Sequence, residues 1–394
     1  MEHVLPIACT RRGFLRFGLG VAAGAPLMLS AACGGTNQHA IQSLVNRPDA
    51  KVAIASCKTY DRSEIQDALS ECFSLLGGIA SLVKGKVVTI KSNLTCDGTF
   101  QDQFGKPAGE SYISHGNTAI VLASMLFGNG AAKVRFVESA PFPLPLDEVL
   151  IMAGWDVTTL QALGDVELEN TRNLGNGTQY LLLDVPGGGY LFSHFELNHS
   201  YSDTGVFLSL AKLKQHLTAG VTLSMKNVFG STPNALYGSD AGNEEAIGWR
   251  GPLHGNGTAD WAGINPPGAN TSTPPADAGS RVPRIVADIN AARPVHIAII
   301  DGITSMSGGE GPWAPSAAPT SPGILIAGLN PVSTDAVGMA VMGYSNPLAP
   351  RGVPPFVNCD NHLLLAQQKE IGSAELSQIQ VSGLTVQEAM YPYP

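Results

Sequence analysis

Residues 210–230, LAKLKQHLTAGVTLSMKNVFG, hold three lysines and one histidine among apolar and small residues. The segment contains no Asp or Glu, although a solvated basic face usually carries acidic residues between its lysines. The whole chain has only 23 Lys and Arg in 394 residues, so this local concentration of positive charge is unusual for it. Such a cluster favours an anion as its partner, either a carboxylate or phosphate of a ligand or a carboxylate of the protein itself.

The spacing of Lys212, Lys214 and His216 is two residues, which in an extended segment places all three side chains on one side. A helix is predicted to begin near Thr218 and to carry Lys226, and the positive end of its dipole adds to the local charge. The neighbouring lysines are expected to lower the pKa of His216, which suits a general base or a metal ligand. The segment therefore predicts a site that holds an anion and moves a proton.

Short apolar runs alternate with amphipathic segments along the rest of the chain. Strands are predicted at residues 51–57, 86–93, 133–139, 179–186, 205–214, 295–301 and 323–330. Helices are predicted at residues 62–83, 117–130, 146–157, 218–230, 333–343 and 361–372. This alternation is typical of an α/β fold with a largely parallel sheet, helices on both faces and long loops at the carboxyl ends of the strands. Residues 51–394 are predicted to form a single domain.

Ligands of open α/β sheets bind beyond the carboxyl ends of the strands, and polar residues follow five of the predicted strands. The predicted catalytic residues are Lys214, His216 and Asp301. The predicted ligand-binding residues are Lys91, Asn93, Lys212, Lys226, Asn227, Glu310 and Asp335. The three acidic residues are expected to orient the base or to bind a divalent metal. A metal site built from His216, His254 and a carboxylate is an alternative that no histidine spacing supports.

Two long segments between the predicted elements lack strand or helix patterns. Residues 263–281 are rich in Pro, Thr and Asn and are expected to form an exposed insertion. Residues 305–323 contain Glu310 and directly follow a strand, and loops of this length in compact domains are often functional.

The N-terminus resembles an export signal. Arg11 and Arg12 are followed by Gly-Phe-Leu and by a weakly apolar run that is too short and too rich in glycine to span a membrane. Residues 1–33 are therefore predicted to be a twin-arginine signal, and the mature chain to work in the periplasm or on the outer surface of the membrane. Cys33 follows Leu-Ser-Ala-Ala, and lipid attachment at Cys33 and simple cleavage both remain open. Residues 34–50 form a polar leader.

Composition excludes several classes of function. The net charge of −9 argues against nucleic acid as a partner. The four cysteines of the body have no Cys-x-x-Cys spacing, so neither an iron–sulfur cluster nor a thiolate zinc site is expected, and most are predicted to be small buried side chains: Cys57, Cys72, Cys96 and Cys359. No Gly-x-Ser-x-Gly motif is present, which argues against a serine hydrolase.

Four motifs together resemble one family. The motifs VTIKSN, AKLKQHLTAGVTLSMKNVFGSTP, IDGITSMSGGEGP and GLNPVSTDAVGMAVMGY are similar, in order and spacing, to the bacterial and archaeal family catalogued as domain of unknown function 362. The resemblance extends from about Val52 to the final IQVSGL. Many members carry a ferredoxin-like cysteine cluster, which this sequence lacks, and His115 stands where members more often have Thr. The resemblance implies a fold but no settled activity.

The sequence thus predicts an exported, metal- or cofactor-dependent catalyst that acts on a small carboxylate or phosphate compound through a Lys/His/Asp pocket. The alternative is a periplasmic or lipid-anchored binding protein that captures an anionic solute without chemistry. Expected partners are the small anion and the twin-arginine export machinery, with no transmembrane helix in the mature protein.

Overall fold

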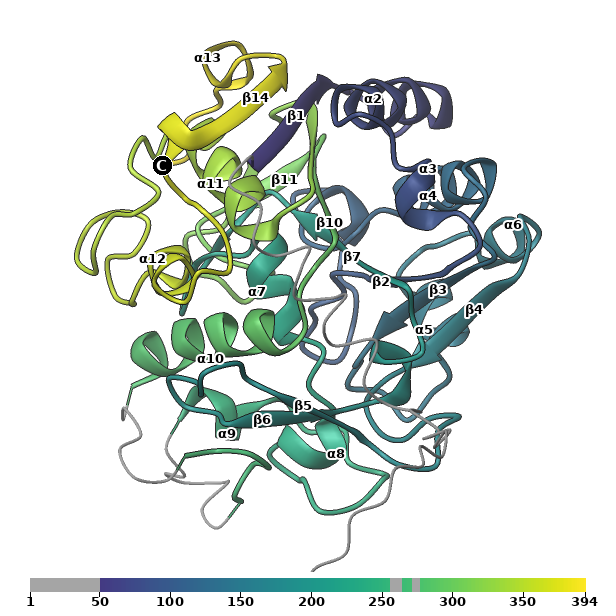
Figure 1. Ribbon diagram of the computed structural model, residues 1–394, viewed down its shortest axis with the longest axis vertical. Coiled ribbons are helices and arrows are strands. Elements are labelled where there is room, and N and C mark those ends of the chain that lie inside the picture. Colours follow the sequence, from purple (N-terminus) through teal and green to yellow (C-terminus); the bar gives the residue numbers. More distant parts are fainter. Residues whose placement is uncertain (1–49, 256–263, 271–276) are drawn as a thin grey trace, which may run out of the picture.

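The computed structural model describes residues 50–255, 264–270 and 277–394 (Figure 1). The predicted export signal, Cys33 and the polar leader up to residue 49 lie outside the described residues. Within the described ranges, no helix combines the length and the apolar character that crossing a membrane requires.

An eight-stranded sheet forms the centre of the described chain (Figure 1). Its strands are β1 (Ala50–Ser56), β2 (Val87–Lys91), β3 (Lys133–Glu138), β4 (Val166–Asn170), β7 (Val206–Lys212), β10 (Ile297–Gly302), β13 (Ile324–Gly328) and β14 (Ile379–Gly383). The strand order is β14–β1–β13–β10–β7–β2–β3–β4, and every neighbouring pair is parallel except the two pairs that involve β13. The predicted largely parallel sheet is confirmed.

Helices cover both faces of this sheet. They are α2 (Arg62–Leu75), α3 (Ala80–Val83), α4 (Gly116–Gly128), α5 (Leu146–Met152), α6 (Val157–Gln161), α7 (Leu223–Phe229), α8 (Asn234–Tyr237), α9 (Gly251–His254), α10 (Ala278–Ala292), α11 (Pro331–Val341), α12 (His362–Gln368) and α13 (Val386–Ala389). Alternate residues of β10 enter different cores: Ala298 and Ile300 join a core that includes residues of α7, α10, α11 and α12, whereas Ile297 and Ile299 join a core that includes residues of α2, α4 and α5. The predicted α/β layering is therefore confirmed.

Shorter elements complete the described chain. Three small hairpins lie outside the main sheet: β5 (Leu181–Asp184) with β6 (His194–Leu197), β8 (Gln215–His216) with β9 (Gly220–Val221), and β11 (Ser305–Ser307) with β12 (Ala318–Thr320). Short 3₁₀ helices occupy Ala108–Glu110, His199–Tyr201 and Leu376–Gln378. The strand predicted at 179–186 thus forms but pairs only with β6, next to α10 (Figure 1). The predicted long loop at 305–323 has the β11–β12 hairpin at its base.

Glycines shorten two of the predicted helices. The helix predicted near Thr218 instead begins at Leu223, because Gly220 has a φ of +75° and belongs to the β8–β9 hairpin. The helix predicted over 62–83 divides into α2 and α3, because Gly77 and Gly78 adopt φ values of +91° and +83°, which end a helix.

Helix α10 occupies residues that the sequence assigned in part to a loop. Val282, Ile285, Val286 and Ile289 have helical spacing and are buried, although Pro283 lies among them. Pro283 is the sixth residue of α10, so its missing N–H leaves one backbone hydrogen bond of the second turn unmade. The remainder of the predicted insertion is described only at residues 264–270.

The reversed direction of β13 corrects one predicted strand end. Because β13 runs antiparallel to β1 and β10, Asn330 leaves the sheet at the edge opposite to the other polar strand ends. Asn330 instead caps α11, accepting hydrogen bonds from the backbone N–H groups of Val332 and Ser333.

Candidate functional site

A cavity of about 800 Å³ opens at the edge of the sheet where β2, β3 and β7 end. Most of the predicted site residues line it: Lys91, Asn93, Lys214, His216, Lys226, Asn227, His254 and Glu310. They come from segments far apart in the sequence, which meet because the carboxyl ends of parallel strands lie at one edge. Its size is within the range of roughly 300–1,000 Å³ that small-molecule sites occupy.

At the floor of the cavity, Lys91 forms a buried ion pair with Glu138. The Lys91 Nζ lies 2.5 Å from Glu138 Oε1, and the two side chains are 1% and 6% exposed. The other carboxylate oxygen of Glu138 accepts a hydrogen bond from the backbone N–H of Leu94. Burial lowers the pKa of Lys91, and Glu138 opposes that shift. The pair fixes the end of β2 against the end of β3, and its charges compensate each other.

Lys214 is fully buried, and its hydrogen-bond partners within the described ranges include no carboxylate. Its Nζ donates to the backbone oxygens of Tyr112, at 2.5 Å, and Glu310, at 2.7 Å. Burial lowers the pKa of Lys214 well below its usual value of 10.5, and the charge of Glu310 only partly opposes this. A bound anion would favour the charged form of Lys214.

Lys226, on α7, is the cation of the cavity wall with the fewest partners among the residues that the structure describes. Its Nζ lies 4.2 Å from the centroid of the Phe229 ring, and no hydrogen-bond acceptor or carboxylate among the described residues pairs with it. Burial lowers the pKa of Lys226 from 10.5 to about 7, reinforced by Arg250 and Lys91, while Glu310 opposes the shift. Near neutral pH, Lys226 therefore populates both its charged and its neutral form.

Helix α7 is held in an unusual conformation at its start. Leu223 has a φ of +46°, which is uncommon for a bulky residue. Asp335 of α11 accepts hydrogen bonds from the backbone N–H groups of Ser224 and Met225, at 2.8 Å each. The buried carboxylate thus satisfies two N-terminal donors of the helix that carries Lys226.

The two histidines of the cavity have different proton positions. Thr218 donates its backbone N–H to His216 Nδ1 at 3.2 Å, so neutral His216 carries its proton on Nε2 and is a donor there. His254 Nδ1 lies 2.7 Å from the backbone oxygen of Arg250, which can only accept, so His254 Nε2 is an acceptor. The lowered pKa predicted for His216 is confirmed, with burial as the largest cause and Lys226 next, and the pKa of His254 falls to about 4.

Glu310 connects the long loop after β10 to the β8–β9 hairpin. Its Oε2 accepts a hydrogen bond from the backbone N–H of Leu217, and its Oε1 accepts one from Trp313 Nε1 at 3.0 Å. Its carboxylate lies 3.6 Å from His216 Nδ1, which is too long for a hydrogen bond. Glu310 thus orders the loop that closes one side of the cavity.

A pair of asparagines leaves one acceptor unused. Asn227 donates to the Lys91 backbone oxygen and to Ser209 Oγ, so its own Oδ1 accepts from Asn93 Nδ2 at 3.1 Å. Asn93 is 7% exposed, and its Oδ1 has no hydrogen-bond partner among the described residues. A buried acceptor of this kind favours a ligand that donates a hydrogen bond.

The structure places Lys212, Asp301 and Asp335 outside the cavity lining. Lys212 Nζ lies 3.2 Å from Asp301 Oδ2 and donates to the Tyr60 hydroxyl at 2.6 Å, and both charged side chains are fully buried. Lys212 does not share a side with Lys214, because the Lys214 N–H bonds to the Lys212 backbone oxygen and this tight turn ends the extended conformation. The predicted common face is therefore wrong for Lys212.

Sequence reasoning missed several residues of the lining, chiefly Arg250, Trp249 and Trp313. Arg250 donates to the backbone oxygens of Ser139, Gly230 and Thr232. It is thus a third cation for which the described residues provide no carboxylate hydrogen-bond partner. These residues could have been found from their position in the sequence, because Trp249 and Arg250 lie a few residues before His254, and Trp313 lies three residues after Glu310.

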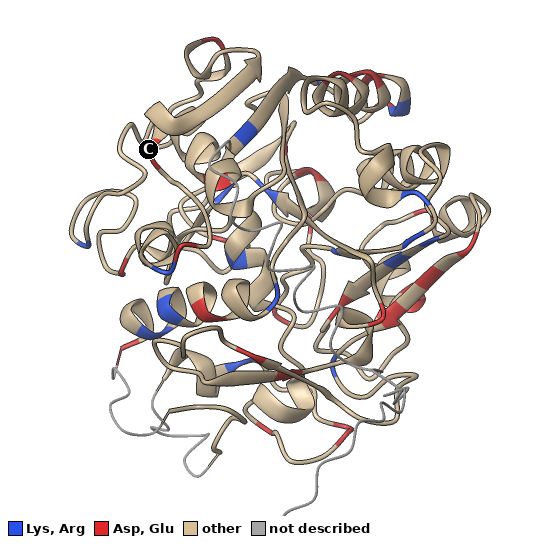
Figure 2. Ribbon diagram, in the orientation of Figure 1, with Lys and Arg blue, Asp and Glu red and all other residues tan. Residues whose placement is uncertain are grey.

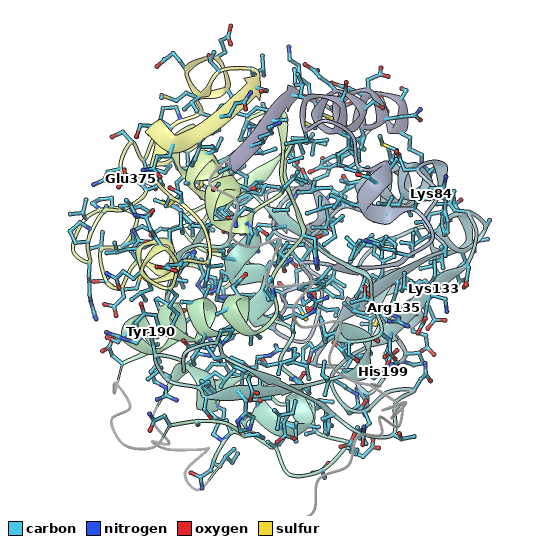
Figure 3. The ribbon with its side chains drawn as sticks, viewed as in Figure 1. Lys84, Lys133, Arg135, Tyr190, His199 and Glu375 are labelled. Carbon is cyan, nitrogen blue, oxygen red and sulfur yellow. The ribbon has the colours of Figure 1, made fainter. Side chains whose placement is uncertain are left out.

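A second charged group lies on the β3–β4 side of the molecule, where acidic residues of β4 stand out in Figure 2. Lys133 and Arg135, labelled in Figure 3, both pair with Glu167 at 3.0 Å. His199 Nε2 lies 2.8 Å from the buried carboxylate of Glu169. These contacts compensate the charges locally, so this group has the character of a structural network.

The described residues contain no group of three or more His, Cys, Asp or Glu side chains arranged to hold a metal ion. His216 and His254 both line the cavity but are not joined by a third ligand there. The described cysteines are free thiols, three of them buried, and only Cys96 reaches the cavity: Cys57, Cys72, Cys96 and Cys359.

Comparison with curated proteins gives no match. The family described as Domain of unknown function (DUF362) matches residues 88–340 of the 394, well over half of the chain. The matched region includes β2, β3, β7, α7 and β10, and hence nearly all of the cavity. The chain therefore belongs to the DUF362 family.

Proposed function

We propose that the chain is an enzyme that binds a small carboxylate or phosphate compound in this cavity and transfers a proton to or from it. Three cations of the lining support the anion: Lys214, Lys226 and Arg250 have no carboxylate hydrogen-bond partner among the described residues. The cavity also contains the carboxylates of Asp97, Glu138 and Glu310. Glu138 pairs with Lys91, and the carboxylate oxygens of Glu310 accept bonds from neutral donors. The observation that carries the proposal is the Lys226 ammonium, with which no carboxylate in the described part of the chain pairs.

Proton transfer is supported by the three titratable groups around that point. Without a ligand Lys226 has a pKa of about 7, and a bound anion favours its ammonium form, so Lys226 is placed to act as the acid in general acid–base catalysis. His216 offers a hydrogen-bond donor, and neutral His254 offers an acceptor. The sequence predicted that His216 carries the proton. In this proposal Lys226 carries the proton instead, and His216 donates a hydrogen bond to the anion. Asp301 has no role, because it lies outside the cavity lining.

Solvent deuterium exchange tests this proposal without knowledge of the natural substrate. A panel of small 2-hydroxy, 2-oxo and 3-oxo carboxylates is incubated with the protein in deuterated buffer at pH 7, and carbon-bound deuterium is followed by proton NMR. We expect at least one compound to exchange faster with the protein than without it, and this excess to disappear in Lys226→Met. Saturable anion binding without exchange by any compound would instead favour the binding protein.

We also propose that the chain is exported by the twin-arginine route, supported by Arg11, Arg12 and the short apolar run that follows them. Arg11→Lys combined with Arg12→Lys is expected to leave most of the protein unprocessed in the cytoplasm, since that route recognises the arginine pair. Immunoblots of fractionated bacterial cells measure this, with Arg16→Lys as a matched control. Unchanged periplasmic protein in the double variant would contradict the proposal.

A further inference from the structure

Large apolar side chains surround the mouth of the cavity. Trp249 is 54% exposed, Leu217 47%, and Trp313 and Ile247 37% each, and all four line the same cavity that holds the cations. Contact between apolar side chains and water is unfavourable, so a group of this kind favours a ligand that covers part of it. Exposed apolar patches that are bordered by polar groups often mark ligand-binding sites.

The charge and the apolar surface occupy different depths of the cavity. Lys91 and Lys214 are 1% and 0% exposed, whereas the two tryptophans are substantially exposed. A bare phosphate, with five heavy atoms, fills on the order of 150 Å³ if each atom takes about the share of one water molecule. The cavity of about 800 Å³ therefore has room for a larger body beyond the anionic group.

We propose that the ligand is an amphipathic anion: a carboxylate or phosphate that reaches Lys226, joined to a planar apolar body that packs against Trp249 and Trp313. This inference rests on the anion site proposed above. Indole rings favour flat partners, which they contact by offset stacking or edge to face.

The contacts of Glu310 show that part of this apolar rim is held in place before a ligand arrives. The indole N–H of Trp313 donates to Glu310 Oε1, and the backbone N–H of Leu217 donates to Glu310 Oε2. One carboxylate therefore fixes two rim residues from different segments of the chain. Because the rim is ordered in advance, less conformational freedom is lost on binding.

Titration calorimetry at pH 6 tests the inference with two matched pairs of probes: inorganic phosphate against phenyl phosphate, and acetate against benzoate. We expect the phenyl compound of at least one pair to bind ten or more times more tightly than its parent anion. Trp249→Ala and Trp313→Ala are each expected to reduce that affinity ratio toward one, whereas Trp313→Phe keeps most of it. Thermal unfolding of each variant identifies any that fails to fold, and the Phe variant then still gives the comparison.

The outcomes separate this inference from the function on which it depends. If the wild-type protein binds the parent anions and Lys226→Met does not, but the phenyl compounds bind no more tightly, the amphipathic ligand is overturned and the anion site stands. If neither parent anions nor phenyl compounds bind, both proposals are overturned. The anionic group is identified by comparing the phosphate with the carboxylate compounds: phenyl phosphate that binds more tightly than benzoate indicates a phosphate, and the reverse indicates a carboxylate.

Discussion

Replacement of Lys226 by methionine is expected to weaken sulfate binding by roughly 10- to 150-fold at pH 6. Hydrogen bonds to a charged group contribute about 1.5–3 kcal/mol, and each 1.4 kcal/mol is tenfold in affinity. Methionine keeps most of the side-chain stem that packs against Phe229, so the loss reports mainly on the ammonium. Titration calorimetry measures the effect. Lys84→Met provides the control, because Lys84 directly follows α3, is exposed and does not line the cavity (Figure 3).

The pH dependence distinguishes a titrating lysine from a fixed charge. Since Lys226 is charged below its pKa of about 7, sulfate binding should be strongest at pH 6 and should weaken as the pH rises through 7 to 8.5. Sulfate itself does not titrate in this range, and burial and neighbouring lysines hold the pKa values of His216 and His254 below it. Lys226→Arg should bind at pH 6 and lose the part of this dependence that Lys226 contributes; burial also lowers the pKa of Lys214, which accounts for any remainder. Equal affinity of Lys226→Met and the wild-type protein would contradict the proposed anion site.

Replacement of Glu138 by glutamine is expected to lower the free energy of unfolding by about 3–5 kcal/mol at pH 7, because it leaves the buried Lys91 ammonium without its carboxylate. Lys91 limits the loss by releasing its proton. The ordinary pKa of a lysine lies about 3.4 units above pH 7, and each pKa unit corresponds to about 1.36 kcal/mol. Deprotonating a lysine at pH 7 therefore costs at most roughly 4.6 kcal/mol. Urea unfolding followed by circular dichroism measures the change. The partly exposed carboxylate of Glu110, which lies 3.8 Å from Lys106, provides the control Glu110→Gln.

The sign of the pH effect tests the cause of that destabilisation. With Glu138 removed, the pKa of Lys91 in the folded state falls further below that in the unfolded state, so the unfolded chain binds more protons. The stability of Glu138→Gln should therefore rise, relative to the wild-type protein, between pH 7 and pH 10. The double variant Lys91→Met with Glu138→Gln should be more stable at pH 7 than Glu138→Gln alone. A double variant that is less stable than the single variant would show that the pair is not the cause.

The sheet and most of the cavity follow from a strong pattern in the sequence. Apolar strands with polar residues directly after them predict which side chains meet, because parallel strands end at one edge; Lys91, Lys214 and Lys226 lie there as predicted. The pattern fails where one local bond changes the chain direction. The backbone hydrogen bond from the Lys214 N–H to the Lys212 oxygen forms a tight turn, and Lys212 therefore pairs with Asp301 outside the cavity. The periodicity of the sequence does not predict this bond.

Other differences have their origin in tertiary contacts. The reversal of β13 depends on its pairing with β1 and β10, which hydrophobicity alone does not specify. Helix α10 forms despite Pro283 because its apolar face packs in the core. Trp249 and Trp313 are single residues in irregular segments, so only the folded chain shows that they share a cavity with the lysines.

The most direct test of the central claim is the pKa of Lys226, measured by NMR on protein labelled with ¹³C at the lysine ε carbons. The Lys226 signal is assigned from its loss in Lys226→Arg. We predict a midpoint of about 7 without ligand and an upward shift in the presence of sulfate, because a bound anion favours the ammonium form. A midpoint near 10.5 that sulfate leaves unchanged would contradict the account.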